Sequence, residues 1–357
     1  VPVRSTLPQA SHVLMQTDEG RLKLVATDLM IATSCWIGAQ VEEEGAITIP
    51  ARIITDFVSS LPNEKIDLSV TDRGKQLHIN CARNEATMAG MDAEDFPPVP
   101  KVDDGLSLQL DQKVLRRAIQ QTQFAAASDD TRPVLTGIHT LVEGDQLTLA
   151  AADGFRLAVH KLHIGQDVPE KVEVIVPARA FREVERLIGD GDGTVEMAIN
   201  EARSQVVFRM DTVELVATLL QGTFPNYGQL IPQSYASRAT INMQQFLQET
   251  RISSIFARDG AGIVRLQIDP DEAKDSAKMT ISARAEEIGE HRGEMDVKME
   301  GEAAKIAFNS RYLQDVLAVL DAEEIALETT NPSSPGVLRP IDGDDYVHVV
   351  MPMFVQW

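Results

Sequence analysis

The chain has 357 residues, of which 43% are hydrophobic, and its 33 Lys and Arg residues against 54 Asp and Glu residues give a formal net charge of −21. This length exceeds what one hydrophobic core organises, so we expect several domains. The negative net charge argues against a protein that binds nucleic acid through its overall electrostatic attraction to phosphates, because Lys and Arg supply that affinity. No apolar run approaches the roughly 20 residues that span a bilayer, so we predict a soluble, cytoplasmic protein without a membrane segment.

The first third of the chain predicts an antiparallel sheet and one helix. Residues 12–19 and 21–37 alternate in hydrophobicity like the two strands of a hairpin, with Asp18-Glu19-Gly20 as the turn. A strand at 46–49 runs into Pro50, which starts a helix over 51–61 whose apolar residues recur at helical spacing. Three strands of a meander follow at 65–71, 76–81 and 85–91, and the Pro-rich run 96–105 predicts a linker.

The other two thirds repeat this order of elements, each with an additional strand and helix at its start. The middle third predicts a strand at 106–110, a helix at 111–127, a hairpin of 134–142 and 146–162 around Glu143-Gly144-Asp145, a strand at 172–176, a helix at 178–188, and strands at 195–200, 205–210 and 214–220. The last third predicts a strand at 237–241, a helix at 243–258, a hairpin to 284, a strand at 293–299, a helix at 309–320, and strands at 324–329, 335–341 and 344–353.

Three landmarks repeat at a nearly constant offset. Asp28 recurs as Asp153, Pro50-Ala51-Arg52 as Pro177-Ala178-Arg179, and Phe96-Pro97 as Phe224-Pro225. A period of this length indicates a triplicated domain and not a stack of short repeats. We therefore predict three α+β domains, 1–104, 105–232 and 233–357, each with two helices packed on a curved antiparallel sheet.

The first copy differs from this pattern. Only about ten residues precede its first hairpin, against about 29 in the second copy, so we expect the first copy to lack its opening strand and helix.

The residues carry no recognisable catalytic motif, so we predict no enzyme activity, no catalytic residue, no cofactor and no metal. Gly189-Asp190-Gly191-Asp192-Gly193 is interpreted as a turn and not as a calcium loop, because the loop position that requires Gly would hold Val195. His160 and His163 are predicted on opposite faces of one strand, where they cannot share a metal. Cys35 and Cys81 are expected as reduced thiols.

The charges are distributed unevenly between the predicted elements. The five predicted helices contain 10 Lys and Arg residues and 6 Asp and Glu residues, which leaves a net charge of −25 for the rest of the chain. This segregation predicts a mildly basic surface wherever the helices gather, under an acidic exterior. The alternative is that these charges only solvate the outer faces of amphipathic helices, and composition alone does not separate the two.

Four motifs in order resemble the bacterial DNA polymerase III β subunit, the sliding clamp family. They are Thr131-Arg132-Pro133-Val134-Leu135-Thr136-Gly137, Ala152-Asp153-Gly154-Phe155-Arg156-Leu157-Ala158, Phe224-Pro225-Asn226-Tyr227 through Leu230-Ile231-Pro232, and Val349-Val350-Met351-Pro352-Met353. The resemblance covers the whole chain and implies a head-to-tail homodimer that forms a ring around double-stranded DNA. It also implies a processivity factor that binds replicative polymerase, clamp loader and repair proteins. The alternative is a triplicated structural or regulatory scaffold that does not encircle DNA.

The resemblance assigns three sets of residues. A peptide-binding cleft would comprise Leu135, Ala152, Gly154, Phe155, Arg156, Leu157, Pro225, Gln229, Leu230, Pro335, Val349, Val350, Met351, Pro352 and Met353. DNA contacts would come by family position from Arg4, Arg132 and Arg179, and by location on polar helix faces from Arg116, Arg117 and Arg251. The dimer interface would use Ala86, Met88, Ile255 and Phe256. Residues 354–357 extend past the usual ending, and Trp357 is expected to compete weakly with peptides for the cleft.

Overall fold

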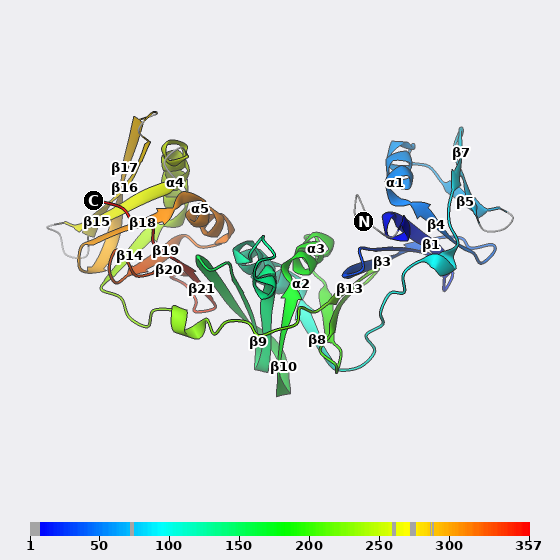
Figure 1. Cartoon of the computed structure of the whole chain (residues 1–357), viewed down its shortest axis with the longest axis horizontal. Helices are drawn as coiled ribbons and strands as arrows, with labels where there is room; N and C mark the ends of the chain where they lie inside the picture. Colours follow the sequence, from blue (N-terminus) through cyan, green and yellow to red (C-terminus); the bar gives the residue numbers. More distant parts are fainter. Residues whose placement is uncertain (1–7, 72–74, 259–261, 272–275, 286, 288) are drawn as a thin grey trace. The chain divides into compact units, whose positions relative to one another are not determined.

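The computed structural model describes residues 8–71, 75–258, 262–271, 276–285, 287 and 289–357 (Figure 1). The chain divides into two compact units: unit 1 is Val1–Lys113 with Arg186–Leu219, and unit 2 is Val114–Glu185 with Leu220–Trp357. Both contain helices packed on antiparallel sheets, which confirms the predicted α+β class. The division cuts through the middle sequence copy, because each large sheet contains strands from two copies.

Unit 1 is built on an eight-stranded sheet and a three-stranded sheet. The large sheet consists, in spatial order, of β4 (Ala46–Pro50), β1 (His12–Asp18), β2 (Arg21–Thr27), β3 (Ile31–Gly38), β13 (Val213–Thr218), β12 (Gln205–Met210), β11 (Thr194–Ile199) and β8 (Leu106–Asp111). The small sheet consists of β5 (Ile66–Val70), β6 (Gln76–Cys81) and β7 (Asn84–Ala89). The remaining elements are α1 (Ala51–Ser60) and the short 3-10 turns η1 (Pro8–Ser11) and η2 (Ala93–Asp95).

One hydrophobic cluster joins α1 to both sheets of unit 1. Ile47 and Ile49 on β4, Ile54 on α1 and Leu77 and Ile79 on β6 are buried together. Alternation along β4 and β6 directs every second side chain into this cluster, as the sequence pattern predicts.

The prediction of one strand over residues 21–37 is wrong, since β2 and β3 are separate strands. The Asp28 side chain ends β2 by accepting hydrogen bonds from the backbone N–H groups of Met30 and Ile31, at 3.0 and 2.8 Å. An aspartate that binds the backbone two and three residues ahead reverses the chain. β2 and β3 therefore pair with each other, with Thr27 opposite Ala32.

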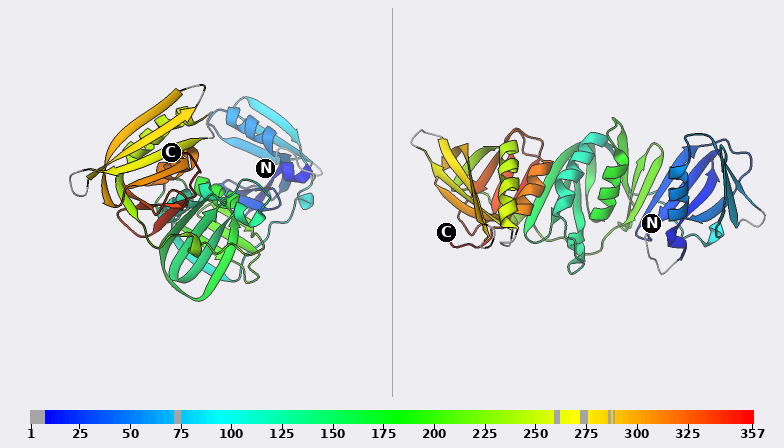
Figure 2. Two further views of the ribbon diagram at one scale, coloured as in Figure 1. Left: turned by 60° about the vertical axis from the view of Figure 1, so that its left-hand side comes forward. Right: turned by 90° about the horizontal axis from the view of Figure 1, so that it is seen from above.

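Unit 2 is built on a ten-stranded sheet. Its strands are, in spatial order, β18 (Ala304–Asn309), β15 (Ile263–Pro270), β16 (Ser276–Ala285), β17 (Gly289–Gly301), β14 (Ser237–Asn242), β19 (Glu324–Thr329), β20 (Gly336–Pro340), β21 (Tyr346–Val350), β10 (Arg156–Pro177) and β9 (Gly137–Ala152). Its helices are α4 (Met243–Ala257), α5 (Ser310–Val319) and most of α2 (Gln112–Thr122) and α3 (Ala178–Ile188), whose residues 112–113 and 186–188 belong to unit 1. The 3-10 turns are η3 (Gln123–Ala125), η4 (Pro133–Thr136) and η5 (Gly228–Leu230). α4 and α5 lie side by side, and α4 packs against β15, β16 and β17 (Figures 1 and 2).

The turn predicted at Glu143-Gly144-Asp145 is absent, because β9 runs through these residues. Gly144 adopts a φ of +59°, and the register between β9 and β10 shifts around its pairing with Val168. A glycine of this kind inside a strand produces an irregularity in the ladder without reversing the chain. The reversal comes later, at residues 153–155, where β9 meets β10.

The prediction for α2 needs correction at its end, and one strand was not predicted. α2 ends at Thr122, whose hydroxyl donates to the carbonyl of Ala118, and the chain then turns through η3. β18 fills the stretch before α5, and the side chain of Asn309 accepts a hydrogen bond from the backbone N–H of Arg311. Asn309 thus caps α5 at the position where the other copies have Pro.

We expect Gly301→Ala to lower the free energy of unfolding by roughly 3 kcal/mol, because its φ is +92° and a Cβ there would lie 2.0 Å from the backbone oxygen of Ala236. Gly289, at the other end of β17, is the matched control. Its φ is +127°, but a Cβ there meets no atom within 4 Å. Gly289→Ala should therefore cost only the backbone strain, about 1 kcal/mol. Urea denaturation of both variants measures the difference, and equal midpoints would contradict it.

Candidate peptide-docking surface

The turn between β9 and β10 forms one side of the predicted cleft. The side chain of Asp153 accepts hydrogen bonds from the backbone N–H groups of Phe155 and Arg156, at 2.8 and 3.0 Å. Gly154 has a φ of +94°, and a Cβ there would lie 2.7 Å from the Arg132 guanidinium. The same guanidinium donates to the Asp153 carbonyl. The turn is therefore fixed on both sides, with the Phe155 side chain 58% exposed.

Antiparallel pairing of β10 with β21 brings the C-terminal motif to this turn. Arg156 lies opposite Val350 and Leu157 opposite Val349. The backbone N–H of Met351 donates to the carbonyl of Phe155 at 2.8 Å, which extends the ladder by one residue. Two apolar side chains from distant parts of the sequence, Phe155 and Met351, are therefore neighbours at the surface.

Two buried clusters form the floor beneath these exposed side chains. One contains Leu157 on β10 and Val349 on β21, and the other contains Leu135 on η4. Ala152 and Tyr227 pack against both clusters. The segment that follows Phe224 lies along this floor, so that Leu230, at the end of η5, stands 52% exposed beside it.

All the residues predicted for the cleft belong to unit 2, but they differ in exposure. Those that a ligand can reach directly are Gly154, Phe155, Pro225, Gln229, Leu230 and Met351. Those that are half-buried are Ala152, Arg156, Pro335 and Met353. Those that are buried are Leu135, Leu157, Val349, Val350 and Pro352. We name the exposed and half-buried side chains, without Arg156, the docking surface.

Arg156 points inward and joins the turn to α5. Its guanidinium donates to the carboxylates of Asp153 and Asp315, at 3.0 and 2.6 Å, and to the carbonyl of Phe124 at 2.7 Å. It also lies 4.5 Å from the ring centroid of Tyr312, which in turn stacks on Phe155. Arg156 therefore positions the docking surface from below. Tyr312, which the sequence did not reveal, supports that surface through its ring contact with Phe155.

A row of rings continues from Arg156 into the core of unit 2, beginning with the half-buried Phe124 and going on to three buried rings. Phe124, His348, Tyr346 and His160 follow one another with centroid separations of 5.4, 6.4 and 6.1 Å. His160 is hydrogen-bonded to Gln121 on α2, which also donates to the carbonyl of Val319. Burial lowers the pKa of His348 to about 3 and that of His160 to about 4. Both rings are therefore neutral near pH 7.

His163 faces away from His160 and is exposed, as predicted for residues three apart on a strand. Across the described ranges, no group of three or more His, Cys, Asp and Glu side chains is arranged to hold a metal ion. Cys35 and Cys81 are free thiols, as predicted. No helix in the described part of the chain is long and apolar enough to cross a membrane.

The arginines predicted to contact DNA have different environments. Arg117 on α2, Arg179 on α3 and Arg251 on α4 are exposed, and Arg116 is half-buried. Arg132 is exposed but bound to the turn at Asp153, as described above. Arg4 lies outside the described residues. The five helices, with their observed ends, hold nine Lys and Arg residues and five Asp and Glu residues, so their net charge of +4 is the predicted one.

The four residues predicted at the dimer interface also differ in exposure. On α4, Ile255 is 57% exposed, whereas Phe256 is half-buried and stacks on His291. On β7, Met88 is only 9% exposed and Ala86 packs against the same core cluster. An interface on β7 would therefore rest on these two side chains as its core and use the exposed residues of the strand.

The C-terminal tail lies beside β18. The backbone N–H of Met353 donates to the carbonyl of Ala307, and the Trp357 ring lies 5.8 Å from the ammonium of Lys305. Trp357 is thus placed on β18, which does not support its predicted position over the docking surface.

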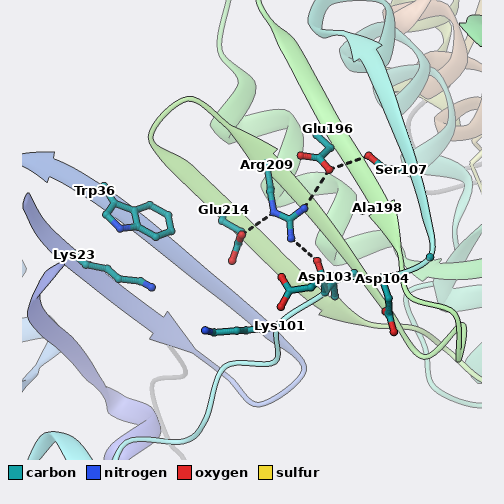
Figure 3. Close-up of a pocket in the computed structure, with 12 residues that line it drawn as sticks. Lys23, Trp36, Lys101, Asp103, Asp104, Ser107, Glu196, Ala198, Arg209 and Glu214 are labelled. Atoms are coloured by element: carbon teal, nitrogen blue, oxygen red, sulfur yellow. Dashed lines mark hydrogen bonds and ion pairs between the residues drawn. The ribbon is translucent and has the colours of Figure 1, made fainter. Parts of the chain in front are cut away.

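A well-defined cavity of about 580 Å³ lies in unit 1, and it is polar (Figure 3). Arg209 on its wall donates to Glu214 and Glu196, at 3.0 and 3.2 Å, and to the carbonyl of Val102 in the linker. Lys101 and Lys23 face the cavity from the other side (Figure 3). The two carboxylates neutralise the charge of Arg209, and its bond to the Val102 carbonyl connects the linker to the sheet. We therefore interpret this cluster as an anchor for the linker.

Comparison with known proteins decides the family. Residues 1–100, 109–226 and 228–354 match the N-terminal, central and C-terminal domains of the DNA polymerase III beta subunit. The chain belongs to the DNA polymerase III beta subunit family. It is 33% identical over 356 residues to the beta sliding clamp of Synechococcus elongatus, covering 99% of this chain and 94% of that protein. It is 30% identical over 360 residues to the beta sliding clamp of Staphylococcus aureus, covering 98% and 93%.

Solved structures of this family share the fold. The DNA polymerase sliding clamp from Bacillus subtilis has a TM-score of 0.93 at 27% identity, covering 100% of this chain and 94% of that one. The sliding clamp from Pseudomonas aeruginosa, solved bound to griselimycin, has a TM-score of 0.91 at 30% identity, covering 99% and 94%. These clamp matches confirm the family resemblance that the four motifs carry.

Acid is expected to destabilise unit 2 through its buried histidines. His348 and His160 stay neutral when folded, while in the unfolded chain they bind protons below a pH of about 6.5. Their contribution to stability is therefore complete above about pH 6.5 and is lost progressively as the pH falls toward 4 for His160 and 3 for His348. We expect the urea midpoint of unfolding to fall from pH 7 to pH 5.

The variant His348→Phe keeps a ring between Phe124 and Tyr346 and removes one titrating group. Its unfolding between pH 7 and pH 5 should take up about one proton fewer than that of the original chain, so its urea midpoint should depend less steeply on pH. His163→Gln, at an exposed position of β10, is the matched control and should keep the steep dependence. Equal slopes for the original chain and His348→Phe would contradict the prediction.

Proposed function

We propose that the chain is a processivity factor, a sliding clamp that encircles double-stranded DNA as a homodimer. In this role it tethers the replicative polymerase, the clamp loader and repair proteins by short peptides bound at the docking surface. The observation that carries the proposal is the docking surface itself, in a chain that belongs to the beta subunit family. The clamp works in the cytoplasm, and its action requires no catalytic residue and no cofactor.

Contact with DNA in this proposal is electrostatic and independent of sequence. Arg117, Arg179 and Arg251 lie on exposed helix faces, and the helices are net positive in a chain whose total charge is −21. A closed ring remains on DNA because of its topology, so weak contacts to phosphates are sufficient. An acidic exterior reduces nonproductive binding to DNA from outside the ring.

The two copies associate head to tail, with α4 of one copy against β7 of the other. Ile255 supports this assignment, because a large apolar side chain that is 57% exposed is typical of a contact surface. A heterologous contact of this kind closes into a ring when its rotation permits closure.

Peptides bind the docking surface through one or two apolar anchors. Phe155, Leu230 and Met351 are each about half exposed above a buried apolar floor. Binding energy concentrates in such desolvated contacts, and a flexible methionine adapts to anchors of different shape.

The decisive experiment compares DNA of two topologies. Clamp loaded by a clamp loader onto a nicked circular duplex should remain bound through gel filtration at 0.5 M salt, about the level that screens phosphate contacts. After linearisation of the same DNA, the clamp should slide off the ends. The alternative of a scaffold that does not encircle DNA predicts equal retention on both forms.

Two variants serve as controls for the topology experiment. Ile255→Asp places a charge in the proposed interface, so it should sediment as a monomer and be lost from both DNA forms. Ile341→Ser changes an exposed apolar residue outside the proposed interface and should behave like the original chain. A dimeric Ile255→Asp protein would contradict the proposed interface but leave the topology result intact.

We expect Leu230→Ser and Met351→Ser each to weaken binding of an apolar peptide at least tenfold, about the loss from removing one anchor contact. Isothermal titration of one peptide from the polymerase into the variants measures this effect. Ile341→Ser is again the control. Unchanged affinity in both variants would show that the peptide binds elsewhere.

A further inference from the structure

Leu29 has an unfavourable backbone conformation that the turn around it holds in place. Its φ is +77°, a region that residues other than Gly, Asn and Asp rarely adopt. Its N–H donates a hydrogen bond to the Thr27 hydroxyl oxygen at 3.0 Å. The turn therefore presents two large apolar residues that are about half exposed, Leu29 at 49% and Met30 at 46%. Exposed apolar residues on a fixed turn are typical of a contact surface.

The turn that carries Leu29 has the same construction as the turn of the docking surface. In unit 1, Asp28 accepts hydrogen bonds from the N–H groups two and three residues ahead. In unit 2, Asp153 does the same. Leu29 thus corresponds to Gly154, which has a similar φ of +94°, and Met30 corresponds to the exposed Phe155.

The strand pairing beside the two turns also corresponds. β3 pairs with β13, and the backbone N–H of Thr218 donates to the carbonyl of Met30 at 2.9 Å. This is the counterpart of the bond from Met351 to Phe155 at 2.8 Å. In both units, the turn belongs to one sequence copy, and the strand that is hydrogen-bonded to it belongs to the following copy.

The apolar floors correspond as well. In unit 2, Tyr227 and Ile231 pack on Val337 and Val349. In unit 1, Val99 and Val102 of the linker pack on Val207 and Val216. At both places, therefore, the segment between two sequence copies packs on strands of the following copy.

We propose that Leu29 and Met30 form a second, weaker docking surface for a short peptide with an apolar anchor. The inference rests on the proposed function, because the ligand chemistry is taken from the corresponding surface in unit 2. The surface is smaller, since Thr218 replaces Met351, so one anchor is bound instead of two. A partner with two such peptide segments would use both surfaces and gain from the high effective concentration of the second segment.

The two surfaces each contain a methionine, Met30 or Met351, which allows both to be observed in one experiment. The full chain is labelled with ¹³C at the methionine methyl groups, and its 12 methionine signals are recorded by NMR. Met30→Leu and Met351→Leu assign the two signals. The ligand is a six-residue peptide that contains Leu and Phe and is blocked at both ends, and a peptide with Ser in place of Leu and Phe is the control.

We expect the Met351 signal to move first. The Met30 signal should move at a peptide concentration roughly tenfold higher, because the second surface binds one anchor and the docking surface binds two. Leu29→Gly removes the side chain and suits the positive φ. It should reduce the affinity reported by Met30 at least fivefold, leave the affinity at Met351 unchanged, and leave the thermal midpoint of unfolding unchanged or higher. The control peptide should move neither signal.

The outcomes separate this inference from the proposed function. A Met30 signal that stays fixed at tenfold the concentration that saturates Met351 overturns the second surface and leaves the first. If neither signal moves, peptide binding at the docking surface fails, and the inference fails with it. A thermal midpoint lowered by more than about 5 °C in Leu29→Gly would show that Leu29 stabilises the fold, which also overturns the inference.

Discussion

The docking surface depends on backbone pairing between β10 and β21. These strands come from different sequence copies, and their ladder sets Phe155 beside Met351 and Leu157 beside Val349. The contact is made by backbone groups, so it leaves the outward side chains available to a ligand. Ala152, Tyr227 and Ile231 pack on the floor that this ladder creates, and Leu230 is the residue directly before Ile231.

Arg156 makes that arrangement rigid, although its charge is largely removed from water. Its side chain is 9% exposed, and its hydrogen bonds run to two carboxylates and one carbonyl. A buried guanidinium is tolerated only when its donors are satisfied in this way. Because its partners come from the turn after β9, from η3 and from α5, the same group connects the turn, the end of α2 and the ring of Tyr312.

Much of the fold could be predicted from periodicity and from the repeat. α3 and α5 begin and end close to their predicted residues, because helical spacing, Pro and Asn signals agree there. The errors lie where one local interaction decides between two conformations. Glu143-Gly144-Asp145 has the composition of a turn but continues a strand, whereas the observed turns form at Asp28 and Asp153. The position of these two residues after a strand favours a turn-stabilising carboxylate, and their hydrogen bonds to the backbone confirm that role.

The candidate surface could be predicted as a set of residues but not as a geometry. The family motifs name side chains that all occur in unit 2, yet only the register of β10 with β21 tells which of them reach solvent. Tyr312 was missed because its contact with Phe155 joins a helix to a turn far away in sequence, and no local pattern marks it. Met88 remains a prediction for the dimer interface, and the structure adds that its side chain also belongs to the core of unit 1.

The division of the chain has a consequence for its synthesis and breakdown. β3 belongs to the first sequence copy but completes its hydrogen bonds with β13 of the second. A nascent or cleaved chain that ends after the first copy would leave the N–H and C=O groups of β3 unpaired along one side. Such an open strand is a template for other chains, so intermediates that lack the next copy are the aggregation-prone species of this protein.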